Sequence, residues 1–93
     1  MKRVLLKSSA FVRAAKKYCK THPEATDDLK SALQLLEADA FHPRLKTHKL
    51  SGLLKDSWAS SAGYDLRIVF KFVTHQASEA ILLETVGTHD EVY

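Results

Sequence analysis

Several residue types are scarce in this 93-residue chain, which has one cysteine, two prolines and three glycines. Cys19 has no partner within the chain, so an internal disulfide cannot form, and this fits a reducing cytoplasm. The glycines form neither a phosphate-binding loop nor a dinucleotide fingerprint, and the G-x-S-x-G nucleophile elbow is missing. These absences exclude the common nucleotide-binding and serine-hydrolase motifs.

Long apolar runs are also missing. The basic start of the chain is interrupted by Lys7 and Arg13 before the apolar region of a signal peptide could form. No stretch approaches the roughly 20 apolar residues that a membrane-spanning helix needs. We therefore expect a cytoplasmic protein without a membrane partner. With 45% apolar and 27% charged residues, the chain is expected to form a single domain over residues 1–93.

The charges are unevenly distributed, although the net charge is only +3. Residues 1–20 and 41–55 carry Lys, Arg and His but neither Asp nor Glu, whereas the acids gather in residues 22–39 and at the C-terminus. This separation predicts a polarised electrostatic field. It favours an anion-binding face, for which nucleic acid is the commonest partner, and a segregated but merely solvated surface is the alternative.

The first part of the chain is expected to form a strand and two helices. Residues 3–7 (RVLLK) are short and apolar, and Ser8 or Ser9 can cap the helix that follows. That helix and the next one carry apolar residues at helical spacing. Pro23 suits the first turn of a helix but not its interior, so it separates the two. They should form a hairpin that covers a sheet.

Three strands are expected in the remainder of the chain. After Asp39 the periodicity is lost, which indicates an ordered loop that leads into a strand near residues 56–60. Residues 64–73 are rich in β-branched and aromatic residues, and residues 80–86 form the last strand before Gly87 releases the chain. The order β-α-α-β-β-β predicts an α+β domain with a four-stranded, mostly antiparallel sheet and the helical hairpin on one face.

Three groups of residues could carry chemistry. Asp65 and Arg67 lie two apart in a strand, so their side chains share one face. The tail can fold back over the sheet face that the helices leave open and bring His89 and Tyr93 to this pair. The third group is the loop around His48. In simpler interpretations the strand pair is an exposed ion pair, the tail histidine caps a loop, the basic loop is solvated, and the final tyrosine docks on the core.

No metal or cofactor is expected. The five histidines show no short ligand spacing, and the single cysteine has no partner for a zinc site. A basic face with histidines, an arginine, a carboxylate and an aromatic is instead suited to cutting RNA through its own 2′-hydroxyl. Histidine can act as acid and base near neutral pH, arginine can clamp the phosphate, and tyrosine can stack on a displaced base.

Three segments of the chain resemble a known family. HPRLKTHKLSGLLKDSW, GYDLRIVFKFV and AILLETVGTHDEVY are similar to the RelE/ParE superfamily of small bacterial toxins, in particular the RelE/StbE and YafQ-like branch of ribosome-dependent mRNA interferases. The resemblance covers essentially the whole chain. Its most specific parts are the THKLSG loop and the closing GTHDEVY.

The resemblance implies roles for individual residues. His48 matches a histidine implicated in YafQ-like catalysis, Asp65 matches the active-site aspartate of that group, and His89 matches its general acid. Tyr93 falls where these toxins place a catalytic or base-stacking aromatic, and Arg67 falls where RelE keeps a phosphate-binding arginine. Four further residues are expected to bind the RNA backbone: Arg44, Lys46, Lys49 and Lys55.

Two positions depart from the YafQ-like pattern, which has a further histidine and a tryptophan where this chain has Ser61 and Leu66. The general base therefore stays open between His48 and Asp65. The resemblance implies a type II toxin that cleaves mRNA in the ribosomal A site without a metal, contacts ribosomal RNA, and is neutralised by a cognate antitoxin. The alternative on the same fold is a ParE-type toxin that inhibits DNA gyrase and cuts nothing.

Overall fold

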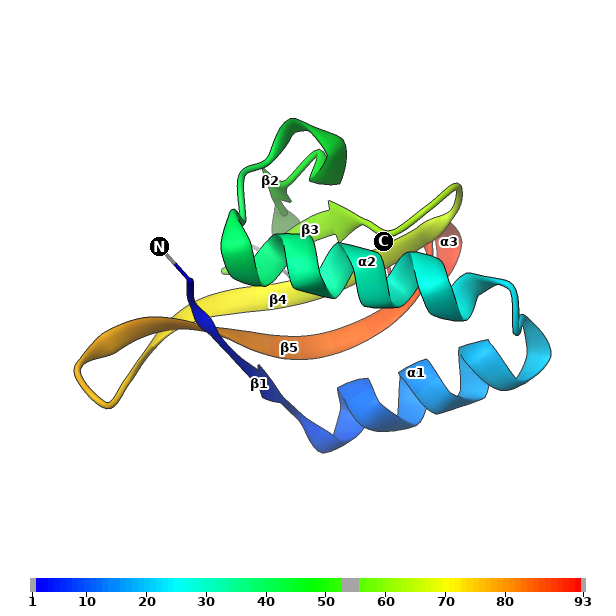
Figure 1. Cartoon of the computed structure of the whole chain (residues 1–93), viewed down its shortest axis with the longest axis horizontal. Helices are drawn as coiled ribbons and strands as arrows, with labels where there is room; N and C mark the ends of the chain where they lie inside the picture. Colours follow the sequence, from blue (N-terminus) through cyan, green and yellow to red (C-terminus); the bar gives the residue numbers. More distant parts are fainter. Residues whose placement is uncertain (1, 53–55, 93) are drawn as a thin grey trace.

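A five-stranded sheet lies at the centre of the computed structural model, which describes residues 2–52 and 56–92. Its strands occur in the order β1-β5-β4-β3-β2, and only β1 and β5 pair in parallel. The elements along the chain are β1 (Val4–Lys7), α1 (Ser9–Thr21), α2 (Ala25–Ala38), η1 (Pro43–Leu45), β2 (His48–Lys49), β3 (Trp58–Ser61), β4 (Leu66–His75), β5 (Ser78–Thr88) and α3 (His89–Val92) (Figure 1).

The first helix begins where the sequence predicts. Ser8 has extended backbone dihedrals, and its Oγ accepts the backbone N–H of Phe11 at 3.0 Å, which satisfies one of the unpaired donors at the helix start. Phe11 is 3% exposed and belongs to the core between the helices and the sheet. Within the described ranges, none of the helices is both long and apolar enough to cross a membrane.

The two faces of the sheet differ. Leu66, Ile68 and Phe70 of β4 are buried in the core formed with α1 and α2. Because successive side chains of a strand alternate between faces, Arg67 lies on the opposite side. We call this side the open face, and we define it by Arg67 and the two residues paired with it, Ser61 and Gly87. Figure 1 shows α2 in front of the sheet and α3 behind its far end.

The α+β class and the helical hairpin are confirmed, but the sheet has one strand more than the four that we predicted. The additional strand is β2, in the segment that we expected to be a loop. Its pairing with β3 is supported by the Thr47 hydroxyl, which donates to the Ala40 carbonyl at 2.6 Å and lies 2.7 Å from the Ser60 hydroxyl. A side-chain contact between residues 13 apart therefore accompanies a short strand that periodicity could not indicate.

The last strand is longer than predicted. Gly87 does not release the chain, because it pairs with Arg67 inside β5, and the strand ends only at Thr88. A register shift between Val69 and Phe70 marks a bulge in this pair of strands, after which the pairing continues to Leu66. The end of β5 therefore lies beside the beginning of β4.

Candidate active site

A short helix, α3, places the tail of the chain at this end of the sheet. The backbone N–H of Thr88 donates to Glu91 Oε1 at 2.8 Å, and the backbone N–H of Glu91 donates to Thr88 Oγ1 at 3.3 Å. These reciprocal bonds form a capping box, the T-x-x-E pattern that starts a helix. The bond from the Thr88 N–H is the largest cause of the lowered pKa of Glu91, and the Thr88 side chain adds to it.

Glycine at position 87 allows α3 to approach the sheet closely. A Cβ built on Gly87 would lie 3.1 Å from Glu91 Oε1 and 3.3 Å from Val92 Cγ1. Because Gly87 pairs with Arg67, this contact lies on the open face. The tail thus packs on the sheet at Gly87 through Glu91 and Val92 of α3.

Backbone hydrogen bonds join His89 to Asp65. The His89 N–H lies 3.2 Å from the Asp65 carbonyl oxygen and 3.4 Å from its carboxylate Oδ1. The His89 ring also lies near Asp90, with 3.6 Å between Nδ1 and Oδ1. Both His89 and Asp65 are exposed, and Asp65 lies just before β4 and not within it as predicted. An imidazole and a carboxylate therefore lie at one solvent-accessible corner.

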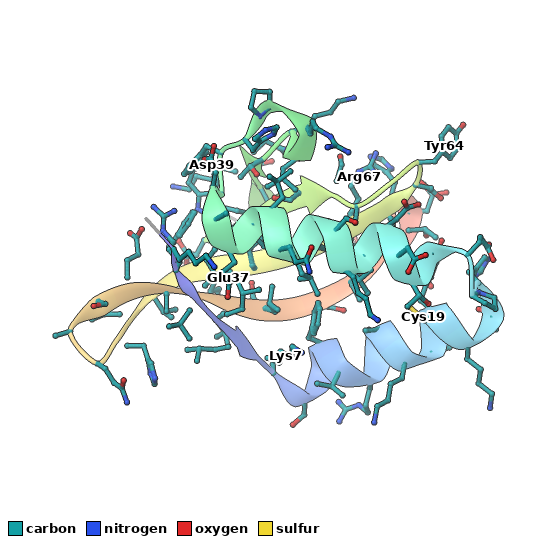
Figure 2. The ribbon with its side chains drawn as sticks, viewed as in Figure 1. Lys7, Cys19, Glu37, Asp39, Tyr64 and Arg67 are labelled. Atoms are coloured by element: carbon teal, nitrogen blue, oxygen red, sulfur yellow. The ribbon has the colours of Figure 1, made fainter. Side chains whose placement is uncertain are left out.

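Arg67 lies two residues from Asp65, on the open face. Its Nη1 donates to the carbonyl of Leu66 at 3.1 Å and to that of Tyr64 at 3.4 Å. The guanidinium thereby contacts the loop between β3 and β4 (Figure 2). Arg67 is half-buried, which restricts its position more than that of a fully exposed arginine. Arg67 therefore adjoins the backbone on both sides of Asp65, which in turn accepts the His89 N–H.

His48 approaches the open face from the opposite edge of the sheet. It pairs with Ala59, which pairs with Val69, two residues beyond Arg67 in β4. Directly paired residues share a face, so His48 and Arg67 lie on the same side with β3 between them. The Nδ1 atom of His48 lies 3.0 Å from the Lys46 carbonyl oxygen. The site thus contains three residues at one corner and a histidine two strands away.

The predicted RNA-binding residues do not share a single surface. Lys49 pairs with Trp58 and follows His48 directly, so it lies on the face opposite to His48. Lys46 is exposed at the end of η1 with a left-handed φ of 51°. Arg44 lines a groove of about 380 Å³ against α2. Lys55 and Tyr93 lie outside the described residues.

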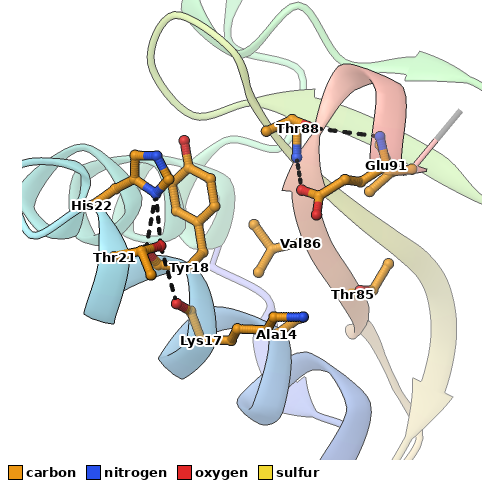
Figure 3. Close-up of a pocket in the computed structure, with 10 residues that line it drawn as sticks. Ala14, Lys17, Tyr18, Thr21, His22, Thr85, Val86, Thr88 and Glu91 are labelled. Carbon is orange, nitrogen blue, oxygen red and sulfur yellow. Dashed lines mark hydrogen bonds between the residues drawn. The ribbon is translucent and has the colours of Figure 1, made fainter.

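A groove of about 560 Å³ lies between α1 and α3, beside the corner that holds Asp65 and His89 (Figure 3). On the α1 side, the rings of Tyr18 and His22 stack with their centroids 4.4 Å apart. Burial raises the pKa of Tyr18, and the Asp65 carboxylate raises it further. Tyr18 packs against the core and also lines this groove, which the sequence analysis did not predict.

The comparisons with known proteins agree with this architecture. No family model and no curated protein sequence matches the chain. Among solved structures, YafQ from E. coli is 18% identical, with 99% of both chains covered and a TM-score of 0.78. A chain of the E. coli DinJ-YafQ toxin-antitoxin complex is 19% identical, covering 100% of this chain and 99% of that chain, with a TM-score of 0.76.

A third neighbour is a YoeB/ParE toxin from Agrobacterium tumefaciens, which is 12% identical and covers 92% of this chain and 98% of its own, with a TM-score of 0.74. At these identities a structural likeness reports on the fold. The three neighbours cover 92–100% of this chain. The chain therefore has the RelE/YafQ-like toxin fold.

Proposed function

We propose that this protein is the toxin of a type II toxin-antitoxin pair and that it cleaves mRNA on the ribosome in the cytoplasm. The observation that carries the proposal is the pair of contacts from the His89 backbone N–H to Asp65, which bring the residue that bears the imidazole to the residue that bears the carboxylate, with Arg67 two positions further along the chain. Groups that can transfer protons and bind phosphate are thus gathered at one exposed corner. The YafQ and YoeB/ParE toxins of the same fold support the toxin assignment.

In the proposed reaction the RNA supplies its own nucleophile. A base, His48 or Asp65, takes the proton of the 2′-hydroxyl, and the 2′-oxygen attacks the adjacent phosphorus. The bond from phosphorus to the 5′-oxygen breaks, and His89 donates a proton to that leaving oxygen. The products are a 2′,3′-cyclic phosphate and a 5′-hydroxyl. The positive charge of Arg67 stabilises the extra negative charge on the phosphate oxygens in the transition state.

The Asp65 carboxylate also has a structural role, because it lies close to the His89 backbone. Whether or not it is the base, it accepts the His89 N–H and so helps to hold the first residue of α3. His48 lies on the same face two strands away, and Ala59 and Val69 between it and Arg67 are buried, so a substrate would have to extend over them to reach both. Tyr93 remains the proposed base-stacking residue of the tail.

The proposed partners follow from charge. The basic outer surface of α1, with Arg13, Lys16, Lys17 and Lys20, suits ribosomal RNA, and so does the exposed Lys46. Arg44, Lys49 and Lys55 are proposed to add further contacts to the RNA backbone. A cognate antitoxin with an acidic segment would cover the same basic surfaces. The DinJ-YafQ complex, a toxin-antitoxin complex of the same fold, supports a protein partner of this kind.

The decisive experiment maps mRNA 5′ ends by primer extension, in cells and on purified programmed ribosomes, for the wild type and His89→Ala. We expect in-frame cleavages with the wild type and at least a hundredfold slower cleavage in the variant, since general acid catalysis contributes about 10²–10⁴-fold. His75→Ala, at the other end of the β4–β5 pair, is the matched control and should cleave normally.

Two results would contradict the proposal. Full cleavage by His89→Ala would mean that another group is the acid. Growth arrest with intact mRNA and with DNA-damage signalling would reject the nuclease and support the ParE-type inhibition of DNA gyrase.

A further inference from the structure

The loop between β3 and β4 presents an aromatic residue that the proposed mechanism does not use. Tyr64 is 99% exposed, the most exposed of the large hydrophobic residues in the described ranges. Figure 2 shows its ring projecting away from the ribbon, on the same side of the molecule as Arg67. Because its side chain is almost fully accessible, Tyr64 adds little to the stability of the fold.

The backbone that carries Tyr64 is anchored. The Ala62 N–H donates to the Leu66 carbonyl at 2.8 Å, and Ala62 itself is 2% exposed. Gly63 has a φ of +92°, and a Cβ at this position would lie 2.9 Å from Asp28 Oδ2, so the loop lies tightly against α2. Arg67 Nη1 donates to the Tyr64 carbonyl. A fixed loop thus holds an exposed ring.

Its neighbours belong to the candidate active site. Tyr64 directly precedes Asp65, whose carbonyl and carboxylate accept the His89 N–H. On the other side, Gly63 lines the groove that contains Arg44 and Asp28. A cation therefore lies on each side of the loop, Arg67 towards the open face and Arg44 in the groove. Positive charges on both sides of the loop favour the approach of an anionic RNA strand to the exposed ring.

We propose that Tyr64 stacks on a nucleobase next to the scissile phosphate and so helps to determine which mRNA sequences bind productively. This inference rests on the proposed nuclease function and adds a specificity residue to it. An aromatic face suits a splayed single-stranded base, and protein contacts to such bases are the common way in which RNA sequence is recognised. The polar groups of the groove, Asp28 and Gln34, can hydrogen-bond to base edges.

The test uses ribosomes programmed with mRNA that carries 2-aminopurine at one position of the A-site codon at a time. The codon is 2′-O-methylated in the binding experiment so that it cannot be cleaved, and it is unmodified in a parallel cleavage experiment. Stacking quenches 2-aminopurine fluorescence. We expect quenching at one position with the wild type and Tyr64→Phe, and its loss with Tyr64→Ala and Tyr64→Leu.

The cleavage kinetics should change in a characteristic way. Tyr64→Ala should raise KM about tenfold, within the range that base–aromatic stacking provides, with kcat nearly unchanged because the acid and the cation are intact. Tyr64→Phe should restore KM. All three variants should melt at the wild-type temperature, since the side chain is 99% exposed.

The two proposals fail in different ways. If wild-type protein cleaves the mRNA while Tyr64→Ala shows the same quenching and the same KM, the role of Tyr64 is rejected and the nuclease stands. If wild-type protein leaves the unmodified mRNA intact on the same ribosomes, the nuclease is rejected, and the role of Tyr64 falls with it.

Discussion

The helices α1 and α3 start with the same chemistry but are held in different ways. Ser8 caps α1 and Thr88 caps α3, each by accepting a backbone N–H three residues ahead. Helix α1 has 13 residues and buries Phe11 in the core, whereas none of residues 89–92 in α3 is buried. The helix that carries His89 therefore depends mainly on local polar contacts.

This difference separates the part of the molecule that holds the fold from the part proposed to hold the chemistry. Local opening has a low free energy where few apolar groups are buried and backbone hydrogen bonds are exposed. We therefore expect α3 to open without unfolding the sheet, whereas α1 should detach only on global unfolding. Changes in α1 should affect stability, and changes around α3 should affect activity.

The largest effect is expected from Phe11→Ala. Removing this buried ring leaves a cavity between α1 and the sheet and should lower the free energy of unfolding by about 3–5 kcal/mol. Val92→Ala in α3, the matched change, should lower it by less than about 1 kcal/mol. Urea denaturation followed by circular dichroism measures both. Equal losses in the two variants would show that α3 is as much a part of the cooperative unit as α1.

A smaller effect is expected from the two caps. Ser8→Ala removes the bond to the Phe11 N–H and the bond to the Glu84 carbonyl, and it should cost about 1 kcal/mol of global stability. Thr88→Ala should leave global stability within about 0.5 kcal/mol but increase hydrogen exchange at the Glu91 amide. Ser9→Ala is the control. A global loss of 1 kcal/mol from Thr88→Ala would contradict the proposed independence of α3.

The same two regions show what could be predicted from sequence. The serine cap and the apolar stripe of α1 are local signals: the cap was predicted at Ser8 or Ser9, and the structure has it at Ser8. The capping box is equally local, since T-x-x-E stands at residues 88–91, but Gly87 before it indicated a chain leaving the sheet. We did not recognise that a glycine at position 87 allows α3 to pack closely on the sheet.

Other features of the site could not be read from local patterns. The contact between His89 and Asp65 joins residues 24 apart, and it depends on the register of β4 and β5 beyond their bulge. The prediction that the tail brings His89 towards Asp65 came from topology, which could not indicate that the contact runs through the His89 backbone N–H. The side-chain contact that accompanies β2 likewise joins Thr47 to Ser60, 13 residues away.

The third prediction concerns the close approach at Gly87. The φ angle of Gly87 lies outside the left-handed region, so the backbone at this position can accept alanine. The new Cβ, however, would lie 3.1 Å from Glu91 Oε1. We expect Gly87→Ala to change global stability by less than about 1 kcal/mol and to shift the amide resonances of residues 88–92. Cleavage should slow about tenfold, because a small displacement of His89 misaligns the proposed acid.

Ser61→Ala, on the other side of Arg67 in the sheet, is the control. Unchanged resonances in Gly87→Ala would reject the role of this glycine.

The smallest effect is the response of α3 to acid. The pKa of Glu91 is lower in the folded tail than in an unfolded one, chiefly because the Thr88 N–H donates to its carboxylate. The ionised carboxylate therefore stabilises α3 above about pH 4.3, the ordinary glutamate value, and this contribution is lost as the pH falls through the lower, folded pKa. Amide exchange at Thr88 and Glu91 should accelerate over this range relative to amides in β4.

Glu91→Gln can accept the same hydrogen bond without titrating, so α3 should persist in this variant and its amide exchange should lose this pH dependence. If Glu91→Gln opened with acid as the wild type does, Glu91 would not be the group responsible.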